Sequence, residues 1–322
     1  MKKLEANQIK SQLRNEKIDI LISSSSFEDR CFVIPEIFAD FNIQRRIIFS
    51  NYNEGDLVRM NASKLVGINK EKSKLVEFNS NDPISIYNQI SNTINEIIID
   101  YSKPRVVIDI TTFTHESLLI LLKYLDLTKS SFNKITCFYV GAKEYSFNIK
   151  NDDEKWLSKG ILDIRTIIGY PGLTDFTEQN HLMILFGFEF NRTRQIIKEY
   201  EYDIISIGFA DIESSIQTNH QKINYERHSK IVSEYSNINE FIFSCVNPYN
   251  TKKQILDYIN QTQFKDLNTV IAPLNNKLST IGAGLAALEN EKIQLAYAKP
   301  AIYNTFGYSI PNKDIYFFDL TF

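Results

Sequence analysis

Hydrophobic and polar positions follow two alternating patterns along the first half of the chain. Short apolar runs predict buried strands at 18–22, 46–50, 74–78, 105–109 and 134–140. Between these runs, apolar residues recur at helical spacing and predict helices at 27–38, at 57–66, after Asp82-Pro83 and after Thr114. Alternation of strands with helices of this length is typical of a parallel, doubly wound sheet.

The second half repeats the alternation after a segment at 151–180 that breaks it and contains a strand-like run at 161–168. It predicts strands at 181–186, 203–209, 240–245, 269–273, 293–298 and 315–320, and helices at 193–201, 222–235, 252–259 and 285–289. Residues 1–17 are polar and predict a short helix or arm. We therefore expect an α/β fold of two tandem Rossmann-like, doubly wound domains with mostly parallel sheets, at 1–172 and 181–322.

Matched landmarks in the two halves indicate a diverged internal duplication. The first predicted strand of each half leads into Phe27-Glu28-Asp29-Arg30 or Phe188-Glu189-Phe190-Asn191-Arg192. A later strand in each half ends abruptly in a polar turn, 79 positions after Arg30 at Asp109 (109 − 30) and 81 positions after Arg192 at Pro273 (273 − 192). The alternative is that any two doubly wound domains place turns at similar intervals.

Composition narrows the class of protein. With 322 residues and 43% hydrophobic content, the chain can bury two cores. Its 36 basic and 39 acidic residues give no electrostatic reason for non-specific nucleic-acid binding, although a local patch stays open. Cys31, Cys137 and Cys245 lack zinc spacing and indicate a reducing compartment. No apolar run approaches the ~20 residues of a membrane span, and the first residues lack a signal-peptide pattern. We expect a cytoplasmic protein without a metal site.

The turn after the first strand is one candidate ligand site. Hydroxyls of Ser25 and Ser26 and free backbone N–H groups there could hold a phosphate, and Arg30 could add a bidentate charge. The alternative is structural, because Ser25 and Glu28 have the spacing of a helix capping box. Glu189 and Arg192 are the corresponding candidates in the second half.

The turn after the fourth strand is a second candidate site. Asp109 lies where a strand ends, which is where α/β proteins place ligand carboxylates. Its polar followers are Thr111, Thr112, Thr114 and His115. Thr114 could instead be the N-cap of the next helix. His115 is a candidate acid or base, but no partner nucleophile is identifiable in the sequence.

Two further candidates lie in the second half. A polar turn expected at 274–284 combines side-chain amides, a lysine, hydroxyls and glycines, with candidate ligands Asn275, Asn276, Lys277, Ser279 and Thr280. It lacks the spacing of a Walker A motif. Tyr303 and Asn304 belong to an aromatic loop that could stack on a base or simply cover a sheet edge.

The serine-rich first turn and Asp109-Ile110-Thr111-Thr112-Phe113-Thr114 together resemble the CARF (CRISPR-associated Rossmann fold) sensor domains. The resemblance covers 18–141 and, more faintly, 181–300. It implies that Ser25, Ser26, Asp109, Thr111 and Thr112 line a pocket for a cyclic oligoadenylate. In the family the second motif usually continues with glycines and a lysine, whereas here Phe113 and His115 follow and only the second half supplies Lys277.

The resemblance also implies a role in bacterial anti-phage defence, beside a separate effector, because the chain carries no recognisable nuclease. The leading hypothesis is a sensor or regulatory subunit that binds a nucleotide-like small molecule in a cleft between the two halves, with a protein effector or a second copy as partner. No cofactor is indicated. One alternative is an enzyme on nucleotides or phosphorylated small molecules, using Asp109, His115, Glu28 or Glu189. Another is a scaffold subunit of a defence complex.

Overall fold

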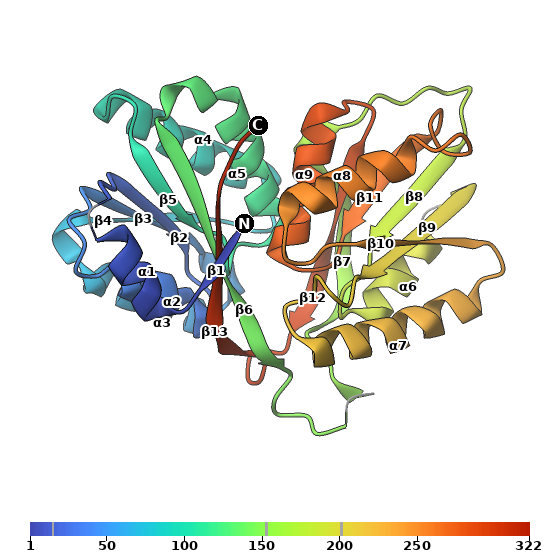
Figure 1. Cartoon of the computed structure of the whole chain (residues 1–322), viewed down its shortest axis with the longest axis horizontal. Coiled ribbons are helices and arrows are strands. Elements are labelled where there is room, and N and C mark those ends of the chain that lie inside the picture. Colours follow the sequence, from blue (N-terminus) through green and yellow to red (C-terminus); the bar gives the residue numbers. More distant parts are fainter. Residues whose placement is uncertain (15, 152–153, 200–201) are drawn as a thin grey trace. The chain divides into compact units, whose positions relative to one another are not determined.

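The computed structural model describes residues 1–14, 16–151, 154–199 and 202–322. In the described chain, two mostly parallel sheets of seven and six strands form two Rossmann-like α/β halves (Figure 1). The predicted fold class is therefore confirmed. The chain divides into two compact units, and each is described by itself below.

The first unit comprises Met1–Glu144 and Ser309–Phe322. In chain order its elements are β1 (Lys2–Leu4), α1 (Ala6–Leu13), β2 (Ile20–Ser24), α2 (Arg30–Ile37), β3 (Arg45–Asn51), α3 (Asp56–Ile68), β4 (Ser73–Phe78), α4 (Pro83–Asp100), β5 (Arg105–Asp109), α5 (His115–Leu127), β6 (Lys134–Tyr145) and β13 (Ser309–Asp319). The strand order is β1-β13-β6-β5-β2-β3-β4, and the pairs from β6 to β4 are parallel. Helices α2 and α3 cover one face of this sheet, and α4 and α5 cover the other (Figure 1).

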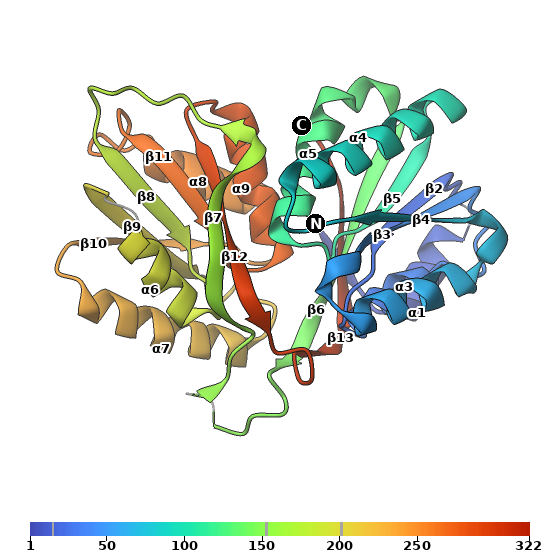
Figure 2. The same cartoon turned by 180° about the vertical axis from the view of Figure 1, so that it is seen from behind.

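The second unit comprises Tyr145–Tyr308. Its elements are β7 (Ser158–Pro171), β8 (Asn180–Leu185), α6 (Phe190–Glu199), β9 (Ile204–Ala210), α7 (Thr218–Glu234), β10 (Ile238–Phe243), α8 (Pro248–Ile259), β11 (Asn268–Pro273), α9 (Lys277–Glu289) and β12 (Gln294–Tyr303). The strand order is β10-β9-β8-β11-β12-β7. Helices α6 and α7 lie on one face of the sheet, and α8 and α9 lie on the other (Figure 2).

The two units repeat one topology. Apart from β1, which pairs antiparallel with β13 at the edge of the first sheet, β13-β6-β5-β2-β3-β4 corresponds strand by strand to β7-β12-β11-β8-β9-β10. A polar contact is repeated as well. Asn61 on α3 donates to the carbonyl of Ser26, 2.8 Å away, and Asn224 on α7 donates to the carbonyl of Gly187, also 2.8 Å away. The matched landmarks therefore belong to a structural repeat and not merely to similar turn intervals.

The chain exchanges the strands β7 and β13 between the two sheets. β7 follows β6 in the chain but pairs antiparallel with β12, while β13 follows β12 but lies beside β6. The first unit is consequently discontinuous, with a division at 144/145 and a return at 308/309. These limits differ from the predicted domains, which assigned the strand around 161–168 to the first domain and 315–320 to the second. Alternating apolar positions identify a strand but carry no information on its partner.

Other expectations also need correction. The segment expected as a polar turn at 274–284 is largely helical, because α9 already begins at Lys277. Gly282 lies inside that helix against α8, where an added Cβ would approach the Cβ of Thr251 to 2.5 Å. Its role is therefore helix packing rather than close approach to a phosphate. Of the segments expected at 193–201 and 1–17, residues 200–201 and 15 lie outside the described residues.

Candidate functional site

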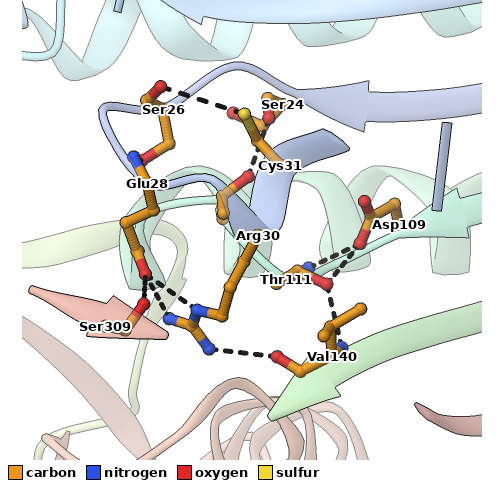
Figure 3. A network of polar contacts seen from close by, with 10 residues as sticks. Ser24, Ser26, Glu28, Arg30, Cys31, Asp109, Thr111, Val140 and Ser309 are labelled. Carbon is orange, nitrogen blue, oxygen red and sulfur yellow. Dashed lines mark hydrogen bonds and ion pairs between the residues drawn. The ribbon is translucent and has the colours of Figure 1, made fainter. Parts of the chain in front are cut away.

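A buried ion pair closes the turn after β2 in the first unit (Figure 3). Nε and Nη2 of Arg30 donate to Oε2 of Glu28 at 2.8 and 2.6 Å, and Nη1 donates to the carbonyl of Val140 at 3.0 Å. The hydroxyl of Ser309 donates to the same Glu28 oxygen at 2.6 Å. Arg30 is 4% exposed. The guanidinium expected to bind a phosphate is thus engaged by a carboxylate of its own turn.

The serines of this turn are buried and only partly bonded. The hydroxyl of Ser26 accepts from the backbone N–H of Glu28 at 3.3 Å. The hydroxyl of Ser25 is buried without a hydrogen-bond partner. The capping box suggested by Ser25 and Glu28 is absent, because the N-cap of α2 is Asp29. Ser25 continues the strand instead, since its N–H donates to the carbonyl of Phe49 at 2.8 Å.

Asp109 ends β5 and is almost inaccessible, at 1% exposure. Its Oδ1 accepts from the N–H of Thr111 at 3.0 Å and from the hydroxyl of the same residue. That hydroxyl accepts in turn from the N–H of Val140, also at 3.0 Å. Oδ2 has no hydrogen-bond partner. Burial raises the pKa of Asp109 to about 7, against the opposing effect of its bonds to Thr111. The carboxyl group is therefore partly protonated near neutral pH.

The remaining residues of the Asp109 turn build the local structure. The hydroxyl of Thr112 donates to the carbonyl of Ser24 at 2.7 Å, which ties the β5 turn to the β2 turn. Thr114 is the N-cap of α5, because its hydroxyl accepts from the N–H of Ser117 at 3.1 Å. His115 is half-buried in the first turn of that helix. The structure thus brings the first-unit candidates to one edge of the sheet, where the hydrogen bonds described above join them mainly to one another and to the local backbone.

In the second unit, the segment that corresponds to the Asp109 turn forms the N-terminus of helix α9. Asn276 caps α9, and the hydroxyls of Ser279 and Thr280 both donate to the Asn276 carbonyl at 2.9 Å. Both hydroxyl residues are fully buried. The side-chain amide of Asn275 donates to the carbonyl of Phe186 at 2.7 Å. Lys277 is the first residue of the helix. The amides and hydroxyls that suggested a phosphate site therefore form hydrogen bonds with backbone groups.

The Glu189 turn of the second unit contains a glutamate and an arginine at similar spacing to those of the Glu28 turn, but they form different hydrogen bonds. Oε1 of Glu189 accepts from the backbone N–H of Ser158, the first residue of β7, at 2.7 Å. Nη2 of Arg192 donates to the carbonyl of Ala298 at 2.7 Å. The Nε of Arg192 is buried and lacks a hydrogen-bond partner. Glu189 and Arg192 share neither a hydrogen bond nor an ion pair, in contrast to Glu28 and Arg30. Burial raises the pKa of Glu189, opposed by the charge of Arg192.

A pocket of about 180 Å³ opens at this turn. Its walls come from the segment before β7, the β8–α6 turn and α7, and the lining residues are Lys155, Trp156, Ser158, Phe188, Glu189, Phe190, Asn191, Arg227 and Lys230. The pocket lies beyond the carboxyl end of β8, at the start of the ten-residue helix α6. This is where Rossmann-like units commonly hold ligands, and a helix N-terminus favours negative charge.

Arg227 joins the walls of the pocket. Its Nη1 donates to the carbonyl of Phe188 at 2.6 Å, and its Nη2 donates to the carbonyl of Lys155 at 2.7 Å. The guanidinium carbon lies 4.2 Å from the ring centroid of Phe188. Outside the pocket, the ammonium of Lys159 lies 4.4 Å from the ring centroid of Trp156. Cations and aromatic faces thus alternate along this wall.

Of the residues that line the pocket, the sequence pattern indicated only Glu189, and Arg192, the other candidate of this turn, does not line it. Trp156 carried a signal, because it is the single tryptophan of the chain. Arg227 and Lys230 carried none, since they belong to an ordinary polar helix and meet Lys155 only through the tertiary fold. Asn304, expected as a ligand, is 5% exposed and donates to the Trp156 carbonyl at 3.2 Å. Tyr303 lies 6.3 Å from Tyr308, ring to ring.

The described residues offer neither a metal site nor a membrane-spanning helix. No group of three or more His, Cys, Asp and Glu side chains there is arranged to hold a metal ion. The three cysteines are buried free thiols whose pKa is raised by burial. Within the same residues, no helix is both long and apolar enough to cross a membrane.

Comparisons with known proteins leave the family open. No family model matches the chain, and no curated protein matches it. A solved structure that does match is that of UDP-GlcNAc 2-epimerase from Neisseria meningitidis bound to UDP-GlcNAc. It is 10% identical, covers 84% of this chain and 91% of that chain, and has a TM-score of 0.26. A likeness of that size carries no argument about function.

Proposed function

We propose that the chain binds a nucleotide-like anionic ligand in the pocket beside β8 and acts as a sensor or regulatory subunit. The observation that carries the proposal is the meeting of Lys155, Arg227 and Lys230 on an aromatic-lined pocket at a strand's carboxyl end. The chain has a net charge of −3, so three cations on one small pocket are a local feature and not a general property.

The pocket suits both parts of a nucleotide. Arginine and lysine side chains hold phosphate oxygens through charge-assisted hydrogen bonds. The rings of Trp156 and Phe188 offer faces on which a base can stack. Glu189 adds one carboxyl group to the wall, and burial raises its pKa, opposed by the charge of Arg192.

The candidate residues of the first unit favour neither catalysis nor phosphate binding there, which leaves the pocket of the second unit as the candidate site. The candidate acid or base of the first unit, Asp109, is 1% exposed, and its candidate anion ligand, Arg30, is held by Glu28. The resemblance of the Ser25 and Asp109 turns to nucleotide-sensor domains adds a biological setting. We therefore propose that the chain works with a separate effector in bacterial anti-phage defence.

Thermal unfolding of the full chain tests binding. The probes are inorganic phosphate and a set of mono- and dinucleotides. A ligand at 100 times its dissociation constant stabilises the folded state by about 2.7 kcal/mol. Replacement of Lys230 by alanine should weaken binding about tenfold, because one charge-assisted bond contributes about 1.5 kcal/mol or more. Lys222→Ala is the matched control, since Lys222 is an exposed lysine of the same helix that does not line the pocket. No stabilisation by any probe, or equal losses in both variants, would refute the proposal.

A further inference from the structure

Aromatic rings continue from the pocket along the surface of the second unit. The ring centroid of Tyr145 lies 5.8 Å from that of Phe188 and 6.2 Å from that of Tyr308. The ring of His220 lies 5.0 Å from Tyr145. Phe188 lines the pocket, so the series begins inside it and runs outward through Tyr145 and Tyr308.

Backbone bonds extend this series by two phenylalanines. The N–H of Ser146 donates to the carbonyl of Tyr308 at 2.9 Å, and the N–H of Phe147 donates to the carbonyl of Gly307 at 3.1 Å. These bonds hold Phe147 beside the segment that carries Phe306. The hydroxyl of Ser146 also donates to the carbonyl of Trp156. Trp156, Phe188, Tyr145, Tyr308, Phe147 and Phe306 together form what we call the aromatic strip.

The outer end of the aromatic strip is open to solvent. Phe306 is 82% exposed and Phe147 is 44% exposed. Exposed apolar rings on neighbouring backbone segments mark an interaction surface, because leaving such rings in water forgoes the free energy of burial. The inner end, at Trp156 and Phe188, is half-buried. A ligand seated in the pocket could therefore extend along rings of increasing exposure.

Basic residues accompany the rings. Lys150 and Lys159 are exposed on either side of Trp156 in the sequence, and Lys155 lines the pocket. The same stretch of sequence also contains Asp152, Asp153 and Glu154, which balance the three lysines in charge, and the carboxylate of Glu154 accepts from the side chain of Asn151 at 3.2 Å. Aromatic side chains interleaved with lysines characterise surfaces that bind single-stranded nucleic acid, where bases stack and phosphates follow the cations.

The size of the pocket limits what it can enclose. A volume of about 180 Å³ is below the roughly 300–1,000 Å³ of pockets that bury a whole drug-sized ligand. A nucleotide held there would leave part of itself outside, next to Tyr145 and Tyr308. The volume, the rings and the lysines point to the same class of ligand.

We infer that the ligand of the second unit is a linear single-stranded oligonucleotide. One nucleotide occupies the pocket, and the following bases stack on Tyr145 and Tyr308 and then on Phe147 and Phe306. The inference rests on the proposed function, since the pocket fixes the first nucleotide. Stacking of this kind depends little on the base sequence of the oligonucleotide, because every base has a π-face.

Fluorescence anisotropy with labelled single-stranded oligonucleotides of one to eight residues tests the inference. Affinity should rise with length over the first few nucleotides and then level off. The double variant Phe147→Ala/Phe306→Ala should lose at least about tenfold in affinity for the longer oligonucleotides, from roughly 1–3 kcal/mol per stacked base. Binding of a mononucleotide should be unchanged. Both rings are exposed, so the fold should tolerate their loss.

Phe176→Ala is the matched control, since Phe176 is a 97% exposed phenylalanine of the same unit outside the aromatic strip. Mononucleotide binding without any length dependence would overturn the inference and leave the proposed function standing. Equal oligonucleotide affinity in the wild type and the double variant would overturn it as well, and would suggest a protein partner for the two rings. Absence of binding at every length, including one, would refute the proposed function itself.

Discussion

The hydroxyl of Ser309 donates a 2.6 Å hydrogen bond to Oε2 of Glu28, a residue 281 positions earlier in the chain. Ser309 is the first residue of β13, and Ser158, the first residue of β7, makes the corresponding contact with Glu189 through its backbone N–H. Each exchanged strand therefore begins at the glutamate of a Phe-Glu turn. The repeated contact fixes where each strand joins its sheet.

Replacing Ser309 by alanine should lower the free energy of unfolding by about 1–3 kcal/mol, because Glu28 is buried and a bond to a charged group is lost. Urea denaturation measures the change. Ser63→Ala is the control, since that exposed serine bonds only within α3, to the carbonyl of Arg59. A loss no larger than the control's would contradict a structural role for the Ser309 contact.

Asp109→Asn should change how stability depends on pH. The folded-state pKa of Asp109 is raised by burial from 3.8 to about 7. A raised carboxyl pKa means that the folded state keeps its proton longer, so stability falls as pH rises from about 4 to about 7. The variant lacks this loss. From pH 4.5 to pH 8, its free energy of unfolding should therefore rise by a few kcal/mol relative to that of the wild type. Urea denaturation at both pH values measures the difference, and a pH-independent difference would contradict the burial effect.

His181 should remain neutral well into the acid range. It is buried between hydroxyls, with Nε2 at 2.8 Å from Ser206 and Nδ1 at 3.2 Å from Thr269, and its ring stacks on Phe264. Burial lowers its pKa from 6.5 to about 4. The folded state binds fewer protons, so stability falls as pH drops from about 6.5 toward 4.

An NMR titration of the imidazole resonances can follow His181 directly, because the chain contains only four histidines. We expect the His181 signals to stay in the neutral form down to about pH 5. His220, which is half-buried against Tyr145, provides an internal comparison in the same spectrum. A midpoint for His181 near 6.5 would show that the imidazole is solvated after all.

The strands and helices were largely predictable because their signals are local. Asp82-Pro83 marks the start of α4 by an aspartate cap and a first-turn proline, and the structure has both. Thr114 likewise proved to be the N-cap of α5. The exchange of β7 and β13 was not predictable, since an alternating apolar pattern fits either sheet equally well.

The candidate site was only partly predictable. Glu189 and Arg192 stood out because their pattern repeats Glu28 and Arg30. Their local sequence does not show that Glu28 and Arg30 form an ion pair, whereas Glu189 and Arg192 do not and a pocket opens beside Glu189. That difference depends on Ser309 and Ser158, which arrive on strands from distant parts of the chain.

Gly187→Ala should strongly destabilise the second unit. An added Cβ at Gly187 would lie 1.9 Å from the carbonyl oxygen of Leu274, where the β8 turn passes the end of β11. Because the clash is with backbone, either the Gly187 turn or the Leu274 turn would have to move. We expect the free energy of unfolding to fall by more than about 3 kcal/mol, or the chain to fail to fold. Thermal unfolding measures the effect.

Gly67→Ala is the matched substitution. Gly67 lies in α3, and nothing lies within 4 Å of an added Cβ. Alanine there should stabilise the chain by roughly 0.5–1 kcal/mol, through the cost that glycine imposes on a helix. Similar effects of the two substitutions would contradict the close approach at Gly187.

The central claim, that the pocket beside β8 binds a nucleotide-like anion, can be tested through Trp156. It is the single tryptophan of the chain and lines the pocket, so tryptophan emission, excited selectively over that of the 17 tyrosines, reports on this site alone. Titration with mononucleotides should change the emission saturably in the wild type and in Lys222→Ala. In Lys230→Ala the midpoint should move to about tenfold higher concentration. Thermal stabilisation by a nucleotide with no change in Trp156 emission would show that the ligand binds elsewhere and would contradict the claim.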